Sequence, residues 1–150
     1  MDLKKFNEAL GSEYILALRL HPKIKDFYTG NIESDEDYID CSDYPSEQEL
    51  MMLSDILITD YSSIMIEFAV LDKPIIFFVY DLDNYLRTER GFYYDFEKTV
   101  PGKLVYSSDE LISAIENNDF DKDKLLSFTR TQFDAIDGKS SERVVDFLLK

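Results

Sequence analysis

The sequence predicts an α/β fold: a Rossmann-like parallel sheet with helices on its flanks. Apolar runs of strand length alternate along the chain with segments that carry apolar residues at helical spacing. Several of these runs are almost uninterrupted, which is typical of strands covered on both faces in a parallel sheet. The length of 150 residues suits one domain with a core of its own, so we expect a single domain over residues 1–150.

The first part of the chain predicts one helix and two strands. Residues 2–10 carry apolar side chains at helical spacing, and Gly11 ends this helix. The apolar run at residues 14–20 is the first predicted strand, and a proline soon after it prevents its extension. A polar stretch at residues 29–37 is expected to be a loop, and residues 38–41 form a short second strand.

The middle of the chain predicts two more strands with helices between them. Ser46 begins a short helix and is followed by the glutamate of a capping box. Strands are expected at residues 56–59 and 75–79, with a helix at residues 62–71 between them. The stretch after Tyr80 is rich in aromatic and charged residues, and we expect an irregular loop of functional importance there.

The last part of the chain predicts one strand and three helices. Residues 104–106 form the strand, and Ser108 begins a helix that extends to residue 115. Two further helices are expected at residues 125–133 and 140–149, the second with its apolar side chains on one face.

The composition excludes several classes of protein. The formal net charge of −15 argues against binding to nucleic acid and against electrostatic docking to anionic lipid. No apolar run approaches the length of a membrane span, about 18 residues, and the N-terminus lacks the apolar stretch of a secretory signal. The one cysteine, Cys41, rules out an internal disulfide and fits a reducing compartment, so we expect a cytoplasmic protein.

A hydroxyl-rich turn gives the strongest indication of a binding site. It lies between the strand at residues 56–59 and the following helix, and it consists of Thr59, Asp60, Tyr61, Ser62 and Ser63. Ligands of parallel α/β sheets bind where strands end and helices begin, and unpaired N–H groups there attract anions. We therefore predict that the turn binds a phosphate or pyrophosphate. The alternative is that the serines only cap the helix.

Three other residues are candidates for the same edge of the sheet. His21 is the only histidine and follows the first predicted strand, where it can act as a cation or donor toward a leaving phosphate. Arg19 lies at the end of that strand and Arg90 lies in the aromatic loop, and either can neutralise a pyrophosphate. The alternatives are a packed position under a loop for the histidine and ordinary surface ion pairs for the arginines.

The aromatic loop also contains acidic residues, which raise the question of a metal site. Asp81, Asp83, Asp95 and Glu97 contain the oxygen atoms that a hard cation prefers, but acidic loops are common in a chain of this charge. We therefore predict no metal and no other cofactor. The aromatic residues can stack on a base or form a small core of their own: Tyr85, Phe92, Tyr93, Tyr94 and Phe96.

Several motifs resemble the carboxyl-terminal half of the CDP-glycerol glycerophosphotransferases, the teichoic acid primases and polymerases. The resemblance covers roughly residues 12–150. It rests on these segments: Arg19-Leu20-His21-Pro22, Leu57-Ile58-Thr59-Asp60-Tyr61-Ser62-Ser63, Lys73-Pro74-Ile75-Ile76-Phe77-Phe78, Arg90-Gly91-Phe92-Tyr93-Tyr94-Asp95-Phe96-Glu97 with Val100-Pro101-Gly102, and Asp137-Gly138-Lys139-Ser140-Ser141-Glu142-Arg143.

This resemblance implies a two-domain glycosyltransferase-B fold, in which the chain is the half that binds the CDP-activated donor. It places His21, Ser62 and Ser63 at the donor phosphates. Glu67 stands where the family usually has aspartate, and its carboxylate is expected at the ribose hydroxyls. The implied reaction transfers glycerol phosphate, or a related polyol phosphate, from a CDP-polyol to a hydroxyl of a growing teichoic-acid or capsule-like polymer.

The resemblance also implies that parts of the enzyme are missing. The acceptor half and the first strand of the donor half are not found in the sequence, so we expect a CDP-donor-binding domain that is incomplete at its N-terminus. Such a chain is expected to be inactive alone. A companion chain could supply the acceptor half and hold the protein at the inner face of the cell membrane.

Two other classes of function stay open. A truncated, non-catalytic module that binds a nucleotide or a partner is favoured by the missing first strand. A receiver-type signalling domain is suggested by the size, the acidity and the segment Asp72-Lys73-Pro74. That domain needs an acidic pair after an opening strand, and residues 1–11 offer no such strand.

Overall fold

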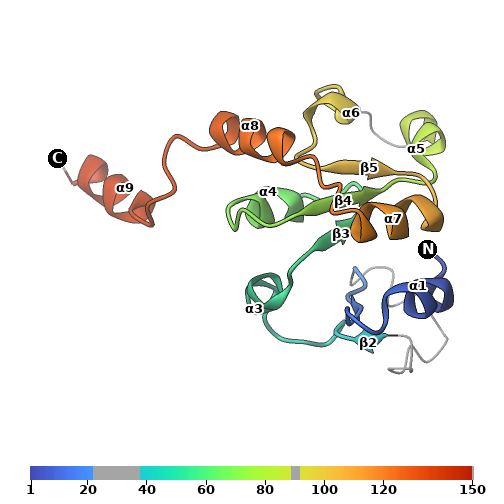
Figure 1. Cartoon of the computed structure of the whole chain (residues 1–150). Coiled ribbons are helices and arrows are strands. Elements are labelled where there is room, and N and C mark those ends of the chain that lie inside the picture. The colour runs from blue at the N-terminus through green and yellow to red at the C-terminus, as the bar shows by residue number, and fades with distance from the viewer. Residues whose placement is uncertain (22–37, 89–91, 150) are drawn as a thin grey trace.

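The computed structural model describes residues 1–21, 38–88 and 92–149. It contains a three-stranded parallel sheet with helices on both faces and a separate two-stranded parallel sheet (Figure 1). The predicted α/β class with parallel strands and flanking helices is therefore confirmed.

The described elements follow the predicted order. The strands are β1 (Ala17–Leu18), β2 (Ile39–Asp40), β3 (Leu57–Thr59), β4 (Ile75–Phe78) and β5 (Lys103–Val105). The helices are α1 (Leu3–Leu10), α3 (Glu47–Leu53), α4 (Ile64–Ala69), α5 (Leu82–Thr88), α6 (Phe96–Thr99), α7 (Ser108–Glu116), α8 (Lys122–Gln132) and α9 (Ser140–Leu148).

The central strand β4 is the most deeply buried strand and carries the core on both of its faces. It pairs with β3 on one side and β5 on the other, in the order β3-β4-β5. Ile75, Ile76 and Phe77 have no exposed surface at all. Because side chains of a strand alternate between faces, Ile75 and Phe77 enter one hydrophobic cluster and Ile76 enters the other.

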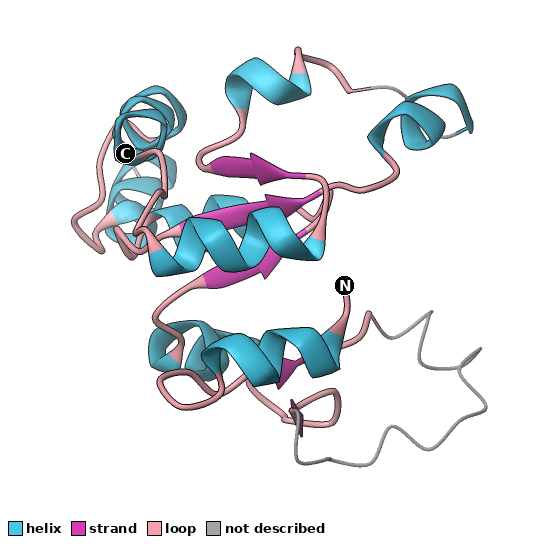
Figure 2. Ribbon diagram, turned by 45° about the vertical axis from the view of Figure 1, so that its right-hand side comes forward, coloured by secondary structure: helices cyan, strands magenta, loops and turns pink. Residues whose placement is uncertain are grey.

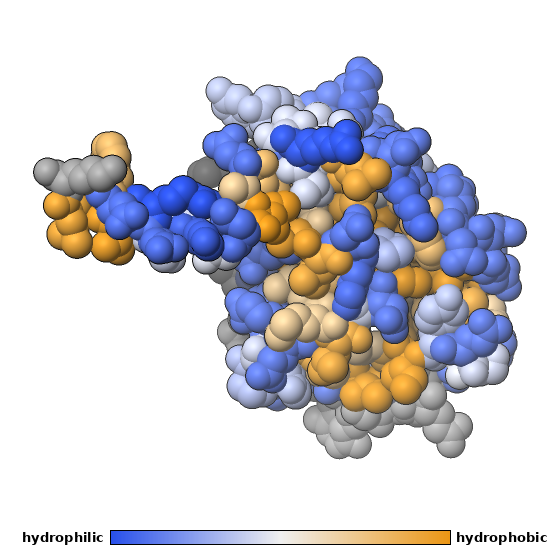
Figure 3. Space-filling model, turned by 60° about the vertical axis from the view of Figure 1, so that its left-hand side comes forward, coloured by the Kyte–Doolittle hydropathy of each residue, from blue (hydrophilic) through white to orange (hydrophobic). Residues whose placement is uncertain are grey.

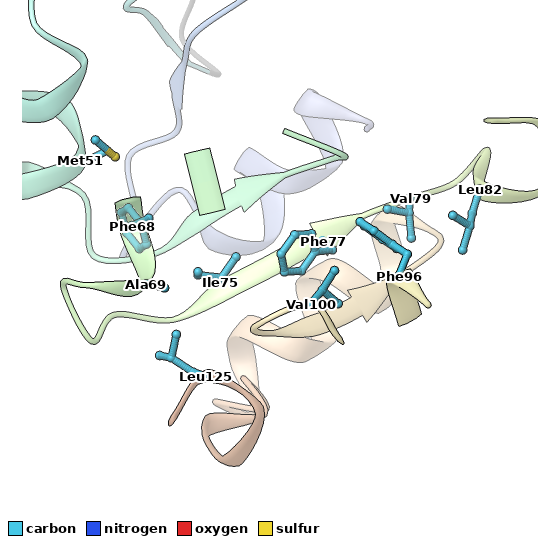
Figure 4. Packing of buried hydrophobic residues seen from close by; sticks show 10 residues of the cluster. All are labelled: Met51, Phe68, Ala69, Ile75, Phe77, Val79, Leu82, Phe96, Val100 and Leu125. Atoms are coloured by element: carbon cyan, nitrogen blue, oxygen red, sulfur yellow. The ribbon is translucent and has the colours of Figure 1, made fainter. Parts of the chain in front are cut away.

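The two clusters explain why helices lie on both faces of the sheet. On one face, α4 and α8 contribute Phe68 and Leu125, which pack with Phe77 and the loop residue Val100 (Figure 4). On the other face, α1 and α7 pack together over Ile76 and β5, and Figure 2 shows these two helices on the same side of the strands. Burial of these side chains, at roughly 25 cal/mol per Å² of apolar surface, is the main stabilising contribution.

A glycine permits the close approach of the chain that leads into β5. Gly102 is buried, and a Cβ atom added to it would lie 2.1 Å from the carbonyl oxygen of Ile75. No side chain fits between these two strands. The segment Val100-Pro101-Gly102 that the resemblance singled out thus has a packing role in this structure.

The first predicted strand differs most from the structure. The apolar run at residues 14–20 was predicted to be a long strand covered on both faces, but only Ala17–Leu18 form β1, and Ile15 is 79% exposed. In the described residues β1 pairs only with β2, so the strands form two parallel sheets. Strand length depends on the neighbours with which a strand pairs, and β1 has one described neighbour.

The region after Tyr80 is more regular than predicted. Residues 82–88 form α5 and residues 96–99 form α6, where the sequence suggested an irregular loop. The side chain of Asp95 accepts a hydrogen bond from the amide of Lys98 and so caps α6. In contrast, the helix predicted at residues 62–71 is shortened to α4, which leaves both serines of the turn outside it.

The C-terminal helix α9 projects from the rest of the described chain (Figure 1). As predicted, its apolar residues gather on one side, but none of them is buried. Phe147 is 80% exposed and Leu148 is 72% exposed, and apolar surface at the end of this projection is visible in Figure 3. The start of α9 is held by Arg143, whose Nη1 and Nη2 atoms donate to the two oxygens of Asp137 at 2.9 and 3.0 Å.

This pairing predicts a strongly acidic carboxyl group at Asp137. The hydrogen bonds from Arg143, followed by that from the Lys139 amide, lower the pKa of Asp137 from 3.8 to about 2. Since the folded-state pKa is depressed, the support that the carboxylate gives to α9 is present above about pH 3.8 and is lost as the pH falls toward 2. We expect a carboxyl-detected NMR titration to give a midpoint of about 2. In Arg143→Gln the midpoint should return toward 3.8, and an unchanged midpoint would contradict the pairing.

Candidate functional site

The hydroxyl-rich turn lies at the carboxyl edge of the three-stranded sheet. Thr59 ends β3 and is paired in register with Phe77 of β4, so the turn that follows β3 and the segment that follows β4 leave the sheet at the same edge. Parallel α/β sheets bind ligands at this edge. The structure thus places the predicted turn where a ligand site is expected, with Thr59 half-buried and Asp60 exposed.

The two serines of the turn are exposed, and their side chains differ in the hydrogen bonds that they make. Ser63 occupies the N-cap position of α4 with helical backbone angles, φ −67° and ψ −9°, and its side chain makes no capping hydrogen bond. The Oγ atom of Ser62 accepts a long hydrogen bond of 3.4 Å from the amide of Ile64. The alternative that both serines serve as helix caps is therefore wrong for Ser63. Because α4 has only six residues, hydroxyls and local amides would contribute more to anion binding than the helix dipole.

Tyr61 fixes the turn against the segment after β4. Its Oη atom donates to Oδ1 of Asp81 at 2.8 Å, and its ring stacks on that of Tyr85 with the centroids 3.9 Å apart. Burial and then the hydrogen bond to Asp81 raise the pKa of Tyr61 well above its usual value, so the phenol stays neutral and remains a donor. These two contacts therefore fix the position of Tyr61 in the turn.

The aromatic residues after Tyr80 divide into two groups, one of which also contains Tyr61. Tyr61, Tyr85, Phe92 and Phe96 form what we call the aromatic cluster, with Phe92 and Phe96 stacked at 4.4 Å. Phe96 also meets Phe77 of β4 edge to face at 5.8 Å, which joins the cluster to the core. The sequence left two interpretations of these aromatic residues open, stacking on a base or forming a small core of their own. The second describes the aromatic cluster. Tyr93 and Tyr94 are 94% and 68% exposed and do not belong to it.

Sequence reasoning did not predict the contact between Tyr61 and Asp81. These residues are 20 positions apart, and no local pattern links them. The contact could have been inferred from the positions of the two residues. Tyr61 follows β3 and Asp81 follows β4, and these two strands are parallel neighbours.

The predicted cationic residues are not all placed as expected. The Nη1 atom of Arg19 donates to the carbonyl oxygens of Cys41 and Tyr44, at 3.0 and 2.8 Å, and so fixes the chain that follows β2. Its role at a pyrophosphate stays a prediction, which these bonds do not favour. His21 is exposed at the end of the first described segment, after β1. Glu67 is exposed in the first turn of α4, and Arg90 lies outside the described residues.

Three of the four acidic residues that raised the question of a metal make other contacts. Asp81 accepts from Tyr61, Asp95 caps α6 and pairs with Lys98 at 2.6 Å, and Glu97 accepts from the hydroxyl of Tyr106 at 2.8 Å. In the described part of the chain, no group of three or more His, Cys, Asp or Glu side chains is arranged to hold a metal ion. The described helices also include none with the length and apolar character of a membrane span.

Comparisons with known proteins give consistent matches along the whole chain. A family model described as CDP-Glycerol:Poly(glycerophosphate) glycerophosphotransferase matches residues 1–150. The chain is 40% identical over 146 residues to the teichoic acid poly(ribitol-phosphate) polymerase of Bacillus spizizenii, with 97% of this chain and 23% of that protein covered. It is 41% identical over 155 residues to the teichoic acid poly(glycerol phosphate) polymerase of Bacillus subtilis, with 100% and 20% covered.

Solved structures give a similar result. The wall teichoic acid polymerase TagF superposes with a TM-score of 0.81 at 31% identity, over 98% of this chain and 37% of that chain. A TagF variant soaked with CDPG gives a TM-score of 0.80 over the same shares. The chain spans only 23% and 20% of the length of the two curated relatives named above.

Proposed function

Because the chain belongs to the CDP-glycerol:poly(glycerophosphate) glycerophosphotransferase family, we propose that it is the donor-nucleotide-binding part of such an enzyme. The observation that carries the proposal is the match of the family model over the full 150 residues. The fold agrees with it, since the chain corresponds to about a third of TagF, a glycosyltransferase-B enzyme. The relatives are named as polymerases and primases of teichoic acids with glycerol or ribitol phosphate units.

The turn at residues 59–63 is the proposed site for the diphosphate of a CDP-polyol. Ser63 has a hydroxyl that is not used for capping, and Ser62 makes only a long hydrogen bond. Asp81 and the aromatic cluster hold the turn through Tyr61, so these hydroxyls are presented without a large loss of entropy on binding. His21 is the proposed donor to the leaving phosphate, Glu67 is proposed to bind the ribose, and Arg90 would neutralise charge.

The proposed reaction is a transfer of polyol phosphate. A hydroxyl oxygen of the polymer acceptor attacks the phosphorus that carries the glycerol, the bond between that phosphorus and the bridging oxygen breaks, and CMP leaves. The proton of the acceptor hydroxyl passes to a base of the acceptor half, and the negative charge that develops on CMP is stabilised by His21 and the hydroxyls of the turn. Rate enhancement in this scheme comes from positioning and from electrostatic stabilisation of the leaving group.

The remaining parts of the enzyme are proposed to come from outside these 150 residues. The acceptor site belongs to the other half of the glycosyltransferase-B fold, which a companion chain could supply. With a net charge of −15, the chain itself is a poor ligand for anionic lipid or nucleic acid. We therefore propose a cytoplasmic location, with any attachment to the inner face of the membrane made through that other half.

Calorimetric titration tests the donor-binding proposal directly. The chain is titrated with CDP-glycerol, CDP-ribitol, CDP, CMP and UDP under the same conditions. We expect the two CDP-polyols and CDP to bind at one site and UDP to bind at least tenfold more weakly. Binding of UDP as tight as that of CDP would contradict a cytidine site. Absence of heat with every nucleotide, at two temperatures to avoid a zero enthalpy, would contradict nucleotide binding by this chain.

A non-catalytic interaction module is the second candidate, and the division of the strands into two sheets favours it. The two candidates differ in their products. With a lipid-linked acceptor and a companion half, the enzyme part should release CMP from CDP-glycerol, whereas the interaction module should not. The family match gives no support to a receiver-type signalling domain.

A further inference from the structure

The turn that follows β2 is closed by its own hydrogen bonds. The amide of Tyr44 donates to the carbonyl oxygen of Cys41 at 3.1 Å, which is the hydrogen bond of a β-turn. Inside this turn, the amide of Ser42 donates to Oδ1 of Asp40 at 2.8 Å. Aspartate is common at such positions because its side chain replaces a backbone acceptor. We call residues 41–44 the β2 turn, whose shape is set by these local bonds.

The β2 turn is bonded to the two residues that lead out of β1. The Nη1 atom of Arg19 carries two N–H groups and donates to two carbonyl oxygens of the turn, at 3.0 and 2.8 Å. The amide of Leu20 donates to Oγ of Ser42 at 3.1 Å. Because β1 and β2 are parallel, both segments leave the two-stranded sheet at the same edge. Three hydrogen bonds therefore hold the chain immediately before His21 against the β2 turn.

Further contacts connect the β2 turn to the three-stranded sheet. The Oη atom of Tyr44 donates to Oε2 of Glu49 in α3 at 2.9 Å. The C-terminal end of α3 is held by Lys73, whose Nζ atom donates to the carbonyl oxygens of Met52 and Ser54 at 2.7 and 2.8 Å. Lys73 lies just before β4, which pairs with β3, the strand that leads into the hydroxyl-rich turn. The end of β1 is thus connected by contacts to the sheet that carries this turn.

We propose that Arg19 and Ser42 are positioning residues for His21. By bonding the chain to the β2 turn where it leaves β1, they set where the histidine lies. This inference rests on the proposed function, in which His21 donates to the leaving phosphate. Such a donor is effective only when its distance and angle to the developing charge are fixed beforehand. Neither positioning residue has to touch the nucleotide for this role.

The other role considered for Arg19 is direct neutralisation of the diphosphate, and Ser42 separates the two roles. Ser42 is half-buried and uncharged, and its Oγ atom accepts from the amide that precedes His21 by one residue. Loss of this hydroxyl disturbs the chain before His21 without removal of a cation. If Arg19 is a positioning residue, Arg19→Gln and Ser42→Ala have the same consequence for His21. If Arg19 contacts the diphosphate, only Arg19→Gln affects the bound nucleotide.

NMR of the chain without nucleotide tests whether the two residues position His21. His21 is the only histidine, so its ring signals need no assignment. We expect Arg19→Gln and Ser42→Ala each to shift these signals and to speed exchange of the Leu20 amide roughly 3- to 10-fold, the effect of one lost hydrogen bond. Ser42→Thr keeps the hydroxyl and should behave like the parent. Arg143→Gln, the same substitution at α9, is the control and should leave the His21 signals unchanged. Ring signals that stay unchanged in both variants would overturn the proposal.

Titration with CDP-glycerol separates positioning from general stabilisation. The ring signals of His21 in the parent should move when CDP-glycerol is added. At saturation, this movement should fall to about half or less in Arg19→Gln and in Ser42→Ala, because a displaced imidazole contacts the phosphate less. Ser42→Thr should restore it. Residues that only stabilise the fold would leave the movement at saturation unchanged, and that result would contradict positioning.

The same titration distinguishes failure of this inference from failure of the proposed function. A loss in Arg19→Gln alone would mean that Arg19 contacts the diphosphate, and the positioning role would be wrong. If other signals of the parent respond to CDP-glycerol and those of His21 do not, the chain binds the donor but the inference about His21 fails. If no signal of the parent responds, the proposed function fails, and the ring signals without nucleotide still decide whether Arg19 and Ser42 position His21.

Discussion

Replacing Phe77 by alanine is expected to destabilise the protein by about 3–5 kcal/mol, the range for a large aromatic removed from a packed core. Phe77 has no exposed surface and lies in β4, between β3 and β5. Its ring packs in the cluster that joins α4 and α8 to the sheet and meets Phe96 at 5.8 Å. The surrounding strands are held in place by their hydrogen bonds, so the cavity cannot close fully and the cost is large.

Urea unfolding of Phe77→Ala measures this loss as a lower free energy of unfolding at an unchanged slope. Tyr93→Ala is the matched control, because its ring is equally large but 94% exposed and lies in no described cluster. It should change stability by less than about 0.5 kcal/mol. A loss below about 1 kcal/mol in Phe77→Ala would mean that β4 is not the centre of the core.

The sequence was most informative where burial is complete. The run at residues 75–79 contains only apolar residues, and it forms β4 at Ile75–Phe78 with helices on both faces. The caps Ser46 and Asp95 act through contacts three residues away, and such contacts are encoded locally. The first of these was predicted, whereas the second was hidden in a stretch that looked irregular because its aromatic residues follow no helical period.

The sequence was least informative where structure depends on distant partners. Residues 14–20 have the composition of a buried strand, but a strand forms its full length only when neighbouring strands supply hydrogen bonds to it. The described chain supplies one neighbour, β2, so β1 is short and Ile15 is exposed. The apolar residues of this run suit a buried position that the described residues do not provide.

The candidate site shows the same division between local and distant information. The turn at residues 59–63 was predicted from its order after a strand, and the structure places it at the carboxyl edge as expected. The partner of Tyr61 could not be inferred in this way, because Asp81 comes 20 residues later and reaches it only through the pairing of β3 with β4. Arg19 was predicted to face a ligand, but its guanidinium bonds to carbonyl groups that local sequence does not reveal.

Replacing Ser62 and Ser63 together by alanine is expected to weaken CDP-glycerol binding by about 1–3 kcal/mol, the scale of lost hydrogen bonds to a charged group. This corresponds to an increase in Kd of roughly 5- to 150-fold in calorimetric titration. Neither hydroxyl has a strong partner among the residues that the structure describes, so the fold should lose little stability. The change in binding can therefore be attributed to the ligand.

The chain contains a matched control for this pair, since Ser140 and Ser141 are also adjacent serines at the start of a helix. They begin α9, which projects from the described chain, and the residue before them makes no side-chain cap either. Ser140→Ala with Ser141→Ala should leave the isotherm for CDP-glycerol unchanged. If the two double variants bind alike, the turn after β3 does not hold the diphosphate. If only the first pair weakens binding, the position of the hydroxyls at the carboxyl edge is what matters, because both pairs share the same local chemistry.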